Sequence, residues 1–254
     1  MKSIFLISSL TGTLILNPIS ASAGTITHYN IDFDAPTHSV GSAPSTGTGS
    51  DQVSRVVFGT PTVEASFAGT PSQSLDFEAA TSTYEQIELN MGQGYDNYQL
   101  SFDFYSENLA GSDYAFTMLA DTPSVRNLSF HGSSGIRYWG GVDGVMSGGS
   151  FSNDTSYNIL LDYDLIGEQV SIWLDGGLLG SNTFTTSGDD IESFRFALSP
   201  WRANAGLDHA LDVDLDNILV TSRTAESTSV PEPGTFLLLL FGLSGLVAVR
   251  RKTG

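Results

Sequence analysis

The chain has 254 residues, and its 28 acidic residues outnumber its ten basic ones, which gives a formal net charge of −18. Such a surface repels nucleic acid and anionic lipid, favours divalent cations, and argues against a nucleic-acid-binding function. The chain contains no cysteine, which excludes both a disulfide framework and a thiol nucleophile.

The N-terminal segment Met1–Ala23 has the layout of a secretory signal peptide. Lys2 precedes an apolar centre, and the segment ends in Ala-Ser-Ala, the small-residue pattern of a cleavage site. We therefore expect export across the inner membrane, with Gly24 as the mature N-terminus.

The body, residues 24–220, is expected to be one all-β domain. Short runs of alternating apolar and polar residues are separated by turns rich in Gly, Ser, Thr, Asn and Asp, a pattern typical of half-buried strands. Many such strands with short turns favour a two-sheet antiparallel β-sandwich or jelly roll. The predicted strands are Ile26–Phe33, Val53–Phe58, Tyr84–Met91, Tyr98–Phe104, Tyr114–Ala120, Tyr157–Tyr163, Val170–Leu174, Phe194–Leu198 and Leu211–Val220.

One hairpin is more specific. Glu168–Phe184 reads EQVSIWLDGGLLGSNTF, in which Asp175-Gly176 separates two apolar runs and provides the positive φ angles of a tight turn. This stretch, with its neighbouring strands from Asn97 to Val220, resembles the concanavalin A-like and laminin-G-like jelly rolls. The resemblance implies a fold, and by analogy a role in binding or cleaving glycans.

The sequence offers no catalytic motif of that fold class, so we expect no enzyme activity. Glu85 and Glu88 differ by an odd number and face opposite sides of a strand, while Asp162 and Asp164 share a face but lack a third member. We interpret all four as solvated acids. The four histidines lack zinc-site spacing and are expected on the surface or in loops.

Acidic residues suggest a structural Ca²⁺ as cofactor. Asp212, Asp214 and Asp216 alternate with apolar residues, but carboxylates at i and i+2 of a straight strand lie about 7 Å apart and cannot all bind one ion. In jelly-roll carbohydrate-binding modules, a calcium ion joins acids near the first strand to an Asp of the last strand. That resemblance implies Asp32, Asp34 and Asp216 as ligands; the alternative is a solvated acidic face.

Three aromatic residues are candidates for stacking on sugar rings. Tyr138 and Trp139 precede Gly140-Gly141, and Trp201 follows Pro200, so we expect these side chains in loops at the edge of the sandwich. The alternative for each is packing in or beside the core, where aromatic residues usually lie.

The C-terminal residues 230–254 form a tail of three parts, which follows a polar linker at residues 221–229. Val230-Pro231-Glu232-Pro233 comes first, then the apolar run 234–249, then the basic cluster that begins with Arg250 and Arg251. Sixteen helical residues span roughly 24 Å, less than the roughly 30 Å of a membrane core, which suggests a temporary transmembrane anchor with its basic end inside.

The tail resembles the PEP-CTERM sorting tails of exported bacterial proteins, which the membrane peptidase exosortase recognises and cleaves. The resemblance implies an exosortase-type partner and a final location at the cell surface or outside the cell. We expect a non-catalytic module that contacts polysaccharide or another matrix component. A secreted glycan-active enzyme and a purely structural matrix protein are the alternatives.

Overall fold

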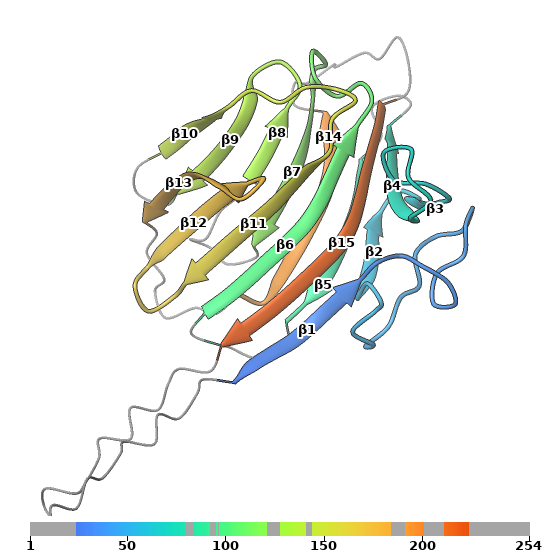
Figure 1. The fold of residues 1–254 in the computed structure, drawn as a ribbon, viewed down its shortest axis with the longest axis horizontal. Coiled ribbons are helices and arrows are strands. Elements are labelled where there is room, and N and C mark those ends of the chain that lie inside the picture. Colours follow the sequence, from blue (N-terminus) through green and yellow to red (C-terminus); the bar gives the residue numbers. More distant parts are fainter. Residues whose placement is uncertain are drawn as a thin grey trace, which may run out of the picture. The chain divides into compact units, whose positions relative to one another are not determined.

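Two antiparallel β-sheets, drawn in Figure 1, make up the part of the chain that the computed structural model describes. The described residues are 24–79, 84–91, 95, 97–120, 128–140, 144–183, 191–200 and 211–223. The predicted signal peptide, the C-terminal tail with its predicted transmembrane segment, and Trp201 lie outside these ranges. Within them, no helix is long and apolar enough to span a membrane.

The first sheet is built around the last strand, β15 (Leu211–Arg223). β15 pairs with β6 along one side, and with β4 and then β1 along the other, so it connects both halves of the sheet. The order is β13 (Gly177–Thr183), β12 (Gln169–Leu174), β11 (Tyr157–Asp164), β6 (Asn97–Ser106), β15, β4 (Ser74–Ala79) and β3 (Thr62–Glu64), with β1 (Thr25–Ile31) beside β15.

The second sheet is likewise antiparallel. Its order is β10 (Gly144–Gly149), β9 (Gly135–Gly140), β8 (Leu128–His131), β7 (Tyr114–Ala120), β14 (Ser193–Pro200), β5 (Glu85–Asn90) and β2 (Arg55–Phe58). The chain crosses repeatedly between the two sheets, since sequence neighbours such as β5 and β6 lie in different sheets. The predicted two-sheet sandwich is therefore confirmed.

The core lies between the sheets and follows the predicted alternation. Every second residue of β6 from Tyr98 to Phe104 is fully buried, because successive side chains of a strand point to opposite faces. The Phe102 ring meets the Phe196 ring of β14 edge-on at 5.0 Å, and Phe77 of β4 meets Phe116 of β7 at 5.6 Å. These contacts join the sheets through the edge-to-face geometry that aromatic pairs prefer.

The predicted hairpin is formed by β12 and β13. Leu174 pairs with Gly177, and the two residues between them, Asp175 and Gly176, have φ angles of 50° and 75°. Positive φ at both central positions is the conformation that a two-residue hairpin needs to match the twist of its strands.

Other elements differ from the sequence prediction. The short strands β3, β4, β8, β9 and β10 were not predicted. β15 runs on to Arg223, three residues into the stretch predicted as a linker, because β1 pairs with this extension as far as Thr25 opposite Arg223.

Candidate functional site

An acidic hollow of about 460 Å³ opens on the outer face of the first sheet. On β4, Leu75 and Phe77 are buried in the core, so the alternate residues face outward; β15 has the same arrangement around Val213. We call this region the acidic hollow. Six carboxylates line it, those of Glu64, Asp76, Glu78, Glu107, Asp212 and Asp214, and Ser66 and Asn108 complete the lining.

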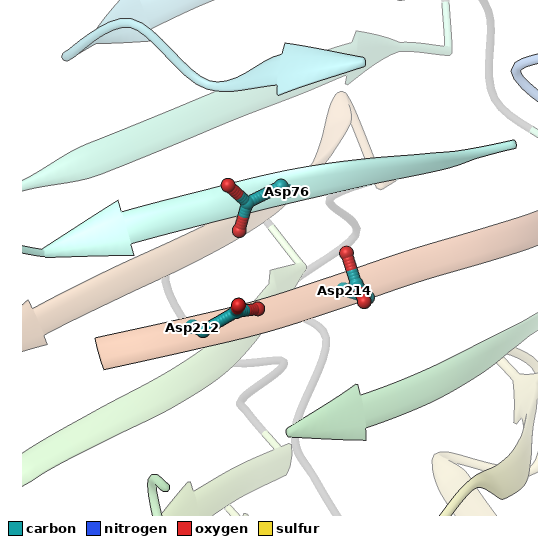
Figure 2. A group of neighbouring side chains, drawn as sticks. All are labelled: Asp76, Asp212 and Asp214. Carbon is teal, nitrogen blue, oxygen red and sulfur yellow. The ribbon is translucent and has the colours of Figure 1, made fainter. Parts of the chain in front are cut away.

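Three of these carboxylates converge where β4 and β15 pair. Asp214 lies directly opposite Asp76 in the register, and Asp212 precedes Asp214 by two residues on the same face. One oxygen from each side chain can be chosen so that all three lie within 4.8 Å of one another. Figure 2 shows the three side chains, which we call the aspartate cluster, with Asp76 on one strand and Asp212 and Asp214 on the other.

Two members of the aspartate cluster are largely removed from water, and Asp212 is partly exposed. Asp76 and Asp214 are each only 8% exposed. The Ser74 hydroxyl lies 2.9 Å from Oδ1 of Asp214 and 2.8 Å from the Ser66 carbonyl oxygen, and its single proton can serve only one of them at a time. The Asp212 backbone N–H donates to Oδ1 of Asn108 at 3.0 Å, which fixes the start of β15 at the rim of the hollow.

Burial and mutual repulsion change the acidity of the cluster. Burial, followed by the charges of Asp212 and Asp214, raises the pKa of Asp76 to about 9. Burial and the Asp212 charge raise the pKa of Asp214 to about 7, although the Ser74 hydrogen bond opposes this shift. Burial, followed by the charges of nearby glutamates, raises the pKa of Asp212 to about 6. A protonated and an ionised carboxyl group therefore coexist here at neutral pH.

The predicted calcium ligands are only partly brought together. Asp34 is close enough to Asp216 for its charge to contribute to a raised pKa of about 6, for which burial is the main cause. Asp216, however, is 1% exposed and accepts a hydrogen bond from the Ser72 hydroxyl, while Asp32 accepts one from the backbone N–H of Asp34. Among the described residues, three carboxylates with one oxygen each within 4.8 Å of the others occur in the aspartate cluster and not at Asp32, Asp34 and Asp216, which therefore remain a prediction.

The loop position predicted for Tyr138 and Trp139 is wrong, because both belong to β9. Tyr138 is 3% exposed and forms part of the core, so its ring is not available to stack on a ligand. Its hydroxyl lies beside Gly180 of β13, where an added Cβ would come within 2.0 Å of it. The side chain of Trp139 and all of Trp201 lie outside what the structure describes.

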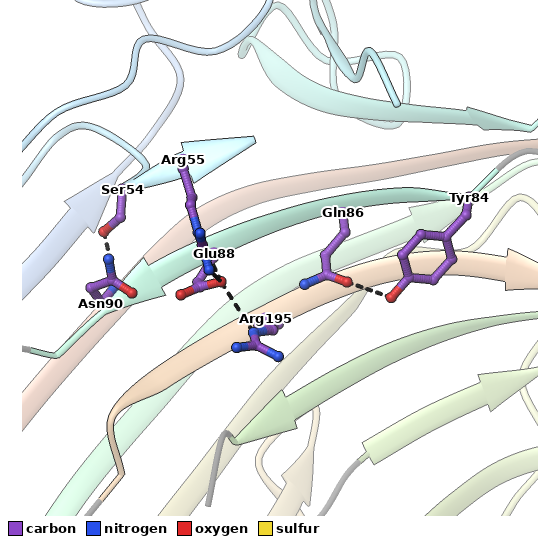
Figure 3. A network of polar contacts seen from close by, with 7 residues as sticks. All are labelled: Ser54, Arg55, Tyr84, Gln86, Glu88, Asn90 and Arg195. Atoms are coloured by element: carbon purple, nitrogen blue, oxygen red, sulfur yellow. Dashed lines mark hydrogen bonds and ion pairs between the residues drawn. The ribbon is translucent and has the colours of Figure 1, made fainter. Parts of the chain in front are cut away.

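The prediction that Glu85 and Glu88 are solvated is also wrong. Both are buried, and they face opposite sides of β5 as expected, since Glu88 pairs with Arg195 and Glu85 with the core residue Leu198. Figure 3 shows Oε2 of Glu88 between Arg55 at 2.7 Å and Arg195 at 3.1 Å. Glu85 accepts backbone hydrogen bonds from Thr60 and Glu78. Both carboxyl groups are therefore held by partners from neighbouring segments of the sandwich.

One histidine, His131 of β8, differs from its predicted surface or loop environment, whereas His38 lies in the loop between β1 and β2 as predicted, although it is buried there. His38 is 2% exposed and His131 is 1% exposed. His38 accepts a hydrogen bond from the Ser45 backbone N–H and contacts the Asp51 carbonyl oxygen, so it holds a loop together. Asp162 is partly exposed and Asp164 is exposed, as expected for solvated acids. Both border a separate hollow of about 230 Å³, whose lining also includes Arg223.

Asp76 is the residue of the cluster that sequence reasoning missed. The pattern Ser74-Leu75-Asp76-Phe77-Glu78 does alternate like a strand, which was the available signal. Its pairing with β15 was not visible, because the two strands are far apart in sequence; Ser74 and Asp214, for example, are separated by 140 residues.

The sequence of residues 229–252 matches the PEP-CTERM protein-sorting motif. No curated protein matches the sequence. This match confirms that the tail is a PEP-CTERM sorting motif, as its sequence predicted, and the motif implies processing by exosortase.

Solved structures resemble the described sandwich in fold. A carbohydrate esterase from a Shiga toxin-encoding bacteriophage has a TM-score of 0.53 at 14% identity, over 79% of this chain and 100% of that one. A sialidase scores 0.51 at 14% identity, over 65% of this chain and 16% of that one. The binding domain of botulinum neurotoxin DC in complex with SialylT scores 0.51 at 8% identity, over 76% and 47%.

At these identities the similarity shows the fold alone, and the chain spans less than half the length of the sialidase and the toxin domain. The combination of this fold and the sorting motif gives the classification that the sequence and structure support: the chain is an exported protein with a jelly-roll β-sandwich body and a PEP-CTERM tail that sorts it to the cell surface.

Proposed function

We propose that the protein is a non-catalytic module that contacts a glycan or another matrix component after an exosortase-type system has delivered it outside the cell. The observation that carries this proposal is the sorting motif at residues 229–252, attached to a jelly-roll sandwich. Structures with a similar fold include a carbohydrate esterase and a toxin binding domain in complex with SialylT, which supports carbohydrate as the ligand class.

The acidic hollow is the contact surface that the described residues favour. Its exposed carboxylates, those of Glu64, Glu78 and Glu107, can accept hydrogen bonds from sugar hydroxyls, and hydrogen bonds to charged groups are among the stronger ones. The same charge repels anionic polymers, so the preferred ligand is a neutral polysaccharide. Trp139 and Trp201 remain candidates for stacking on sugar rings.

Binding of the processed protein to neutral and anionic polysaccharides tests the proposal. Glu107→Gln removes one exposed charge from the hollow and should weaken binding to a neutral glycan about tenfold, since a hydrogen bond to a charged group contributes about 1.5–3 kcal/mol. Glu168→Gln, in the turn between β11 and β12, removes a partly exposed charge that does not line the hollow, so it is the control and should bind like the wild type. Trp139→Ala and Trp201→Ala test the aromatic candidates.

Failure of the wild type to bind any polysaccharide would remove the glycan proposal and favour a purely structural matrix protein. Equal binding by the wild type, Glu107→Gln and the two tryptophan variants, all folded by circular dichroism, would place the contact surface elsewhere.

A glycan-active enzyme is a second candidate because of the aspartate cluster. Glycosidases need one protonated and one ionised carboxyl group a few ångströms apart, and the raised pKa of Asp76 provides such a pair with Asp212. Release of reducing sugar from a polysaccharide, abolished in Asp212→Asn and retained in Asp162→Asn, would establish this candidate. Its absence with every polysaccharide that the protein binds would support the non-catalytic proposal.

A further inference from the structure

The aspartate cluster contains a buried polar atom that the described residues leave unsatisfied. Asp76 is 8% exposed, and its Oδ1 is buried without accepting any hydrogen bond. Buried polar atoms nearly always have a partner, because an unsatisfied one loses its hydration without compensation. Asp76 projects from β4, and Asp212 and Asp214 project from the neighbouring strand β15 (Figure 2).

The surroundings of this atom lack a compensating positive charge. The lining of the hollow includes three further carboxylates, those of Glu64, Glu78 and Glu107, and no Lys or Arg. Six acidic groups on one patch repel one another, and this repulsion adds to the cost of burying Asp76. A bound cation would offset both the cost of burying Asp76 and the repulsion among the six acidic groups.

We propose that Asp76, Asp212 and Asp214 bind a divalent cation, and that this cation is Ca²⁺. All side-chain donors in the hollow are carboxylate, amide or hydroxyl oxygens, which suit hard cations, and the absence of His and Cys from the lining disfavours zinc.

The spacing of the cluster fits this ion. Calcium binds oxygens at about 2.4 Å, so two ligands on opposite sides of one ion are about twice that distance apart. The three chosen oxygens lie within 4.8 Å of one another, so an ion can be accommodated without a large rearrangement of β4 or β15. Glu64, Glu78 and water can complete the six to eight ligands that calcium takes, whereas Mg²⁺ requires a tighter octahedron.

The ion would act as a cross-link in a chain without disulfides. Asp76 comes from β4 and the other two ligands come from β15, so binding would hold together two strands that are distant in sequence. This inference goes beyond the proposed function, because the ion would be bound whether or not the protein contacts a glycan.

The test uses the full chain as the cell processes it, stripped with a chelator and dialysed into metal-free buffer without carbohydrate. Calcium chloride alone is titrated by calorimetry, and thermal unfolding is followed by circular dichroism with calcium or with chelator. At a calcium concentration about 100 times the dissociation constant, the melting temperature should rise by about 5–10 °C. Magnesium chloride should give a smaller shift at the same concentration.

Asp76→Asn and Asp214→Asn should each remove the calcium-dependent shift. Asparagine keeps the shape of the side chain, so both variants should stay folded in chelator. Asp212→Asn changes the least buried ligand and should weaken calcium binding at least tenfold, which keeps the test decisive if a buried variant fails to fold. Asp162→Asn, on β11 of the same sheet, is the matched control and should keep the full shift.

Two results would overturn the inference. The first is a wild type whose melting temperature is the same in calcium and in chelator. The second is a full calcium shift in Asp76→Asn or Asp212→Asn. In particular, loss of the shift in Asp34→Asn together with its retention in Asp76→Asn would place the ion near Asp34 and Asp216 instead.

Discussion

The ion-pair network around Glu88 should contribute measurably to stability. Oε2 of Glu88 accepts from Nη2 of Arg55 at 2.7 Å, from Nε of Arg55 at 3.1 Å and from Nε of Arg195 at 3.1 Å. The Glu88 side chain is 5% exposed, while those of Arg55 and Arg195 are 57% and 31% exposed. The network links β2, β5 and β14 on the outer face of the second sheet (Figure 3).

Glu88→Gln keeps the shape and one acceptor oxygen but removes the charge. Each hydrogen bond then changes from charge-assisted to neutral at that end, a loss of about 1 kcal/mol, and solvent screening reduces the contribution of the exposed Arg55. We expect a total destabilisation of about 2 kcal/mol. For a domain of 150–250 residues, this corresponds to a decrease in melting temperature of about 4–8 °C.

The assay is thermal and urea unfolding at pH 7, with Glu168→Gln as a control that removes one partly exposed acidic charge from a turn. A double-mutant cycle with Arg195→Met isolates the Glu88–Arg195 term from the other interactions of that arginine. The reasoning is refuted if Glu88→Gln costs no more than Glu168→Gln, or if the coupling energy in the cycle is zero.

Three further predictions concern acid stability, the hairpin and processing. Burial, together with the Arg137 charge, lowers the pKa of His131 to about 4, so the contribution of this group to stability is complete above pH 6.5 and is lost as the pH falls to 4. Between these pH values, His131→Gln should therefore lose about 1–3 kcal/mol less free energy of unfolding than the wild type, as measured by urea titration. Identical pH profiles for the two proteins would contradict this. Gly176→Ala should cost about 1–2 kcal/mol because φ is 75°, whereas Gly177→Ala, next to it and without a positive φ, should cost less. Mass spectrometry of secreted material should show Gly24 at the N-terminus and loss of the chain from about Gly234 onward, and a full-length chain from cells that contain the peptidase would refute the sorting prediction.

The strands that could be predicted are those with strong apolar alternation. In β6 and β11, large aromatic and aliphatic residues occupy every second position, and the structure buries them as expected, with Tyr157 at the start of β11 only partly buried. The Asp175-Gly176 turn could also be predicted from the local sequence, because a two-residue turn requires residues that tolerate positive φ.

The glycine-rich strands could not be predicted in the same way. β9 and β10 contain glycines at their ends, which in the sequence are typical of turns. In the structure, at least one strand glycine has a packing role instead, because Gly180 of β13 leaves the space that the buried Tyr138 hydroxyl occupies. A local pattern does not show which distant side chain needs that space.

Only part of the candidate site could be predicted from the sequence, for a related reason. The sequence placed Asp212, Asp214 and Asp216 on one face, but the register of β15 shifts after Asp216, where Asn217 adopts a φ of 51°. Asp216 instead bonds to Ser72 and to the backbone N–H of Asn217. The third member of the cluster is the cross-strand neighbour Asp76, which only the pairing of β4 with β15 reveals.

The position of the aspartate cluster gives it more influence than its size suggests. β15 pairs with β4, β6 and β1, so a perturbation at its start affects the strand that joins both halves of the first sheet. The chain places Asp76, whose buried Oδ1 has no hydrogen-bond partner, and five more acids at this start, although it has no cysteine to cross-link these strands. Repulsion among these acids would loosen β4 from β15, whereas a shared divalent ion would turn the same charges into a link between them. The stability of the exported protein should therefore depend on calcium outside the cell, and the dependence should be lost with Asp76.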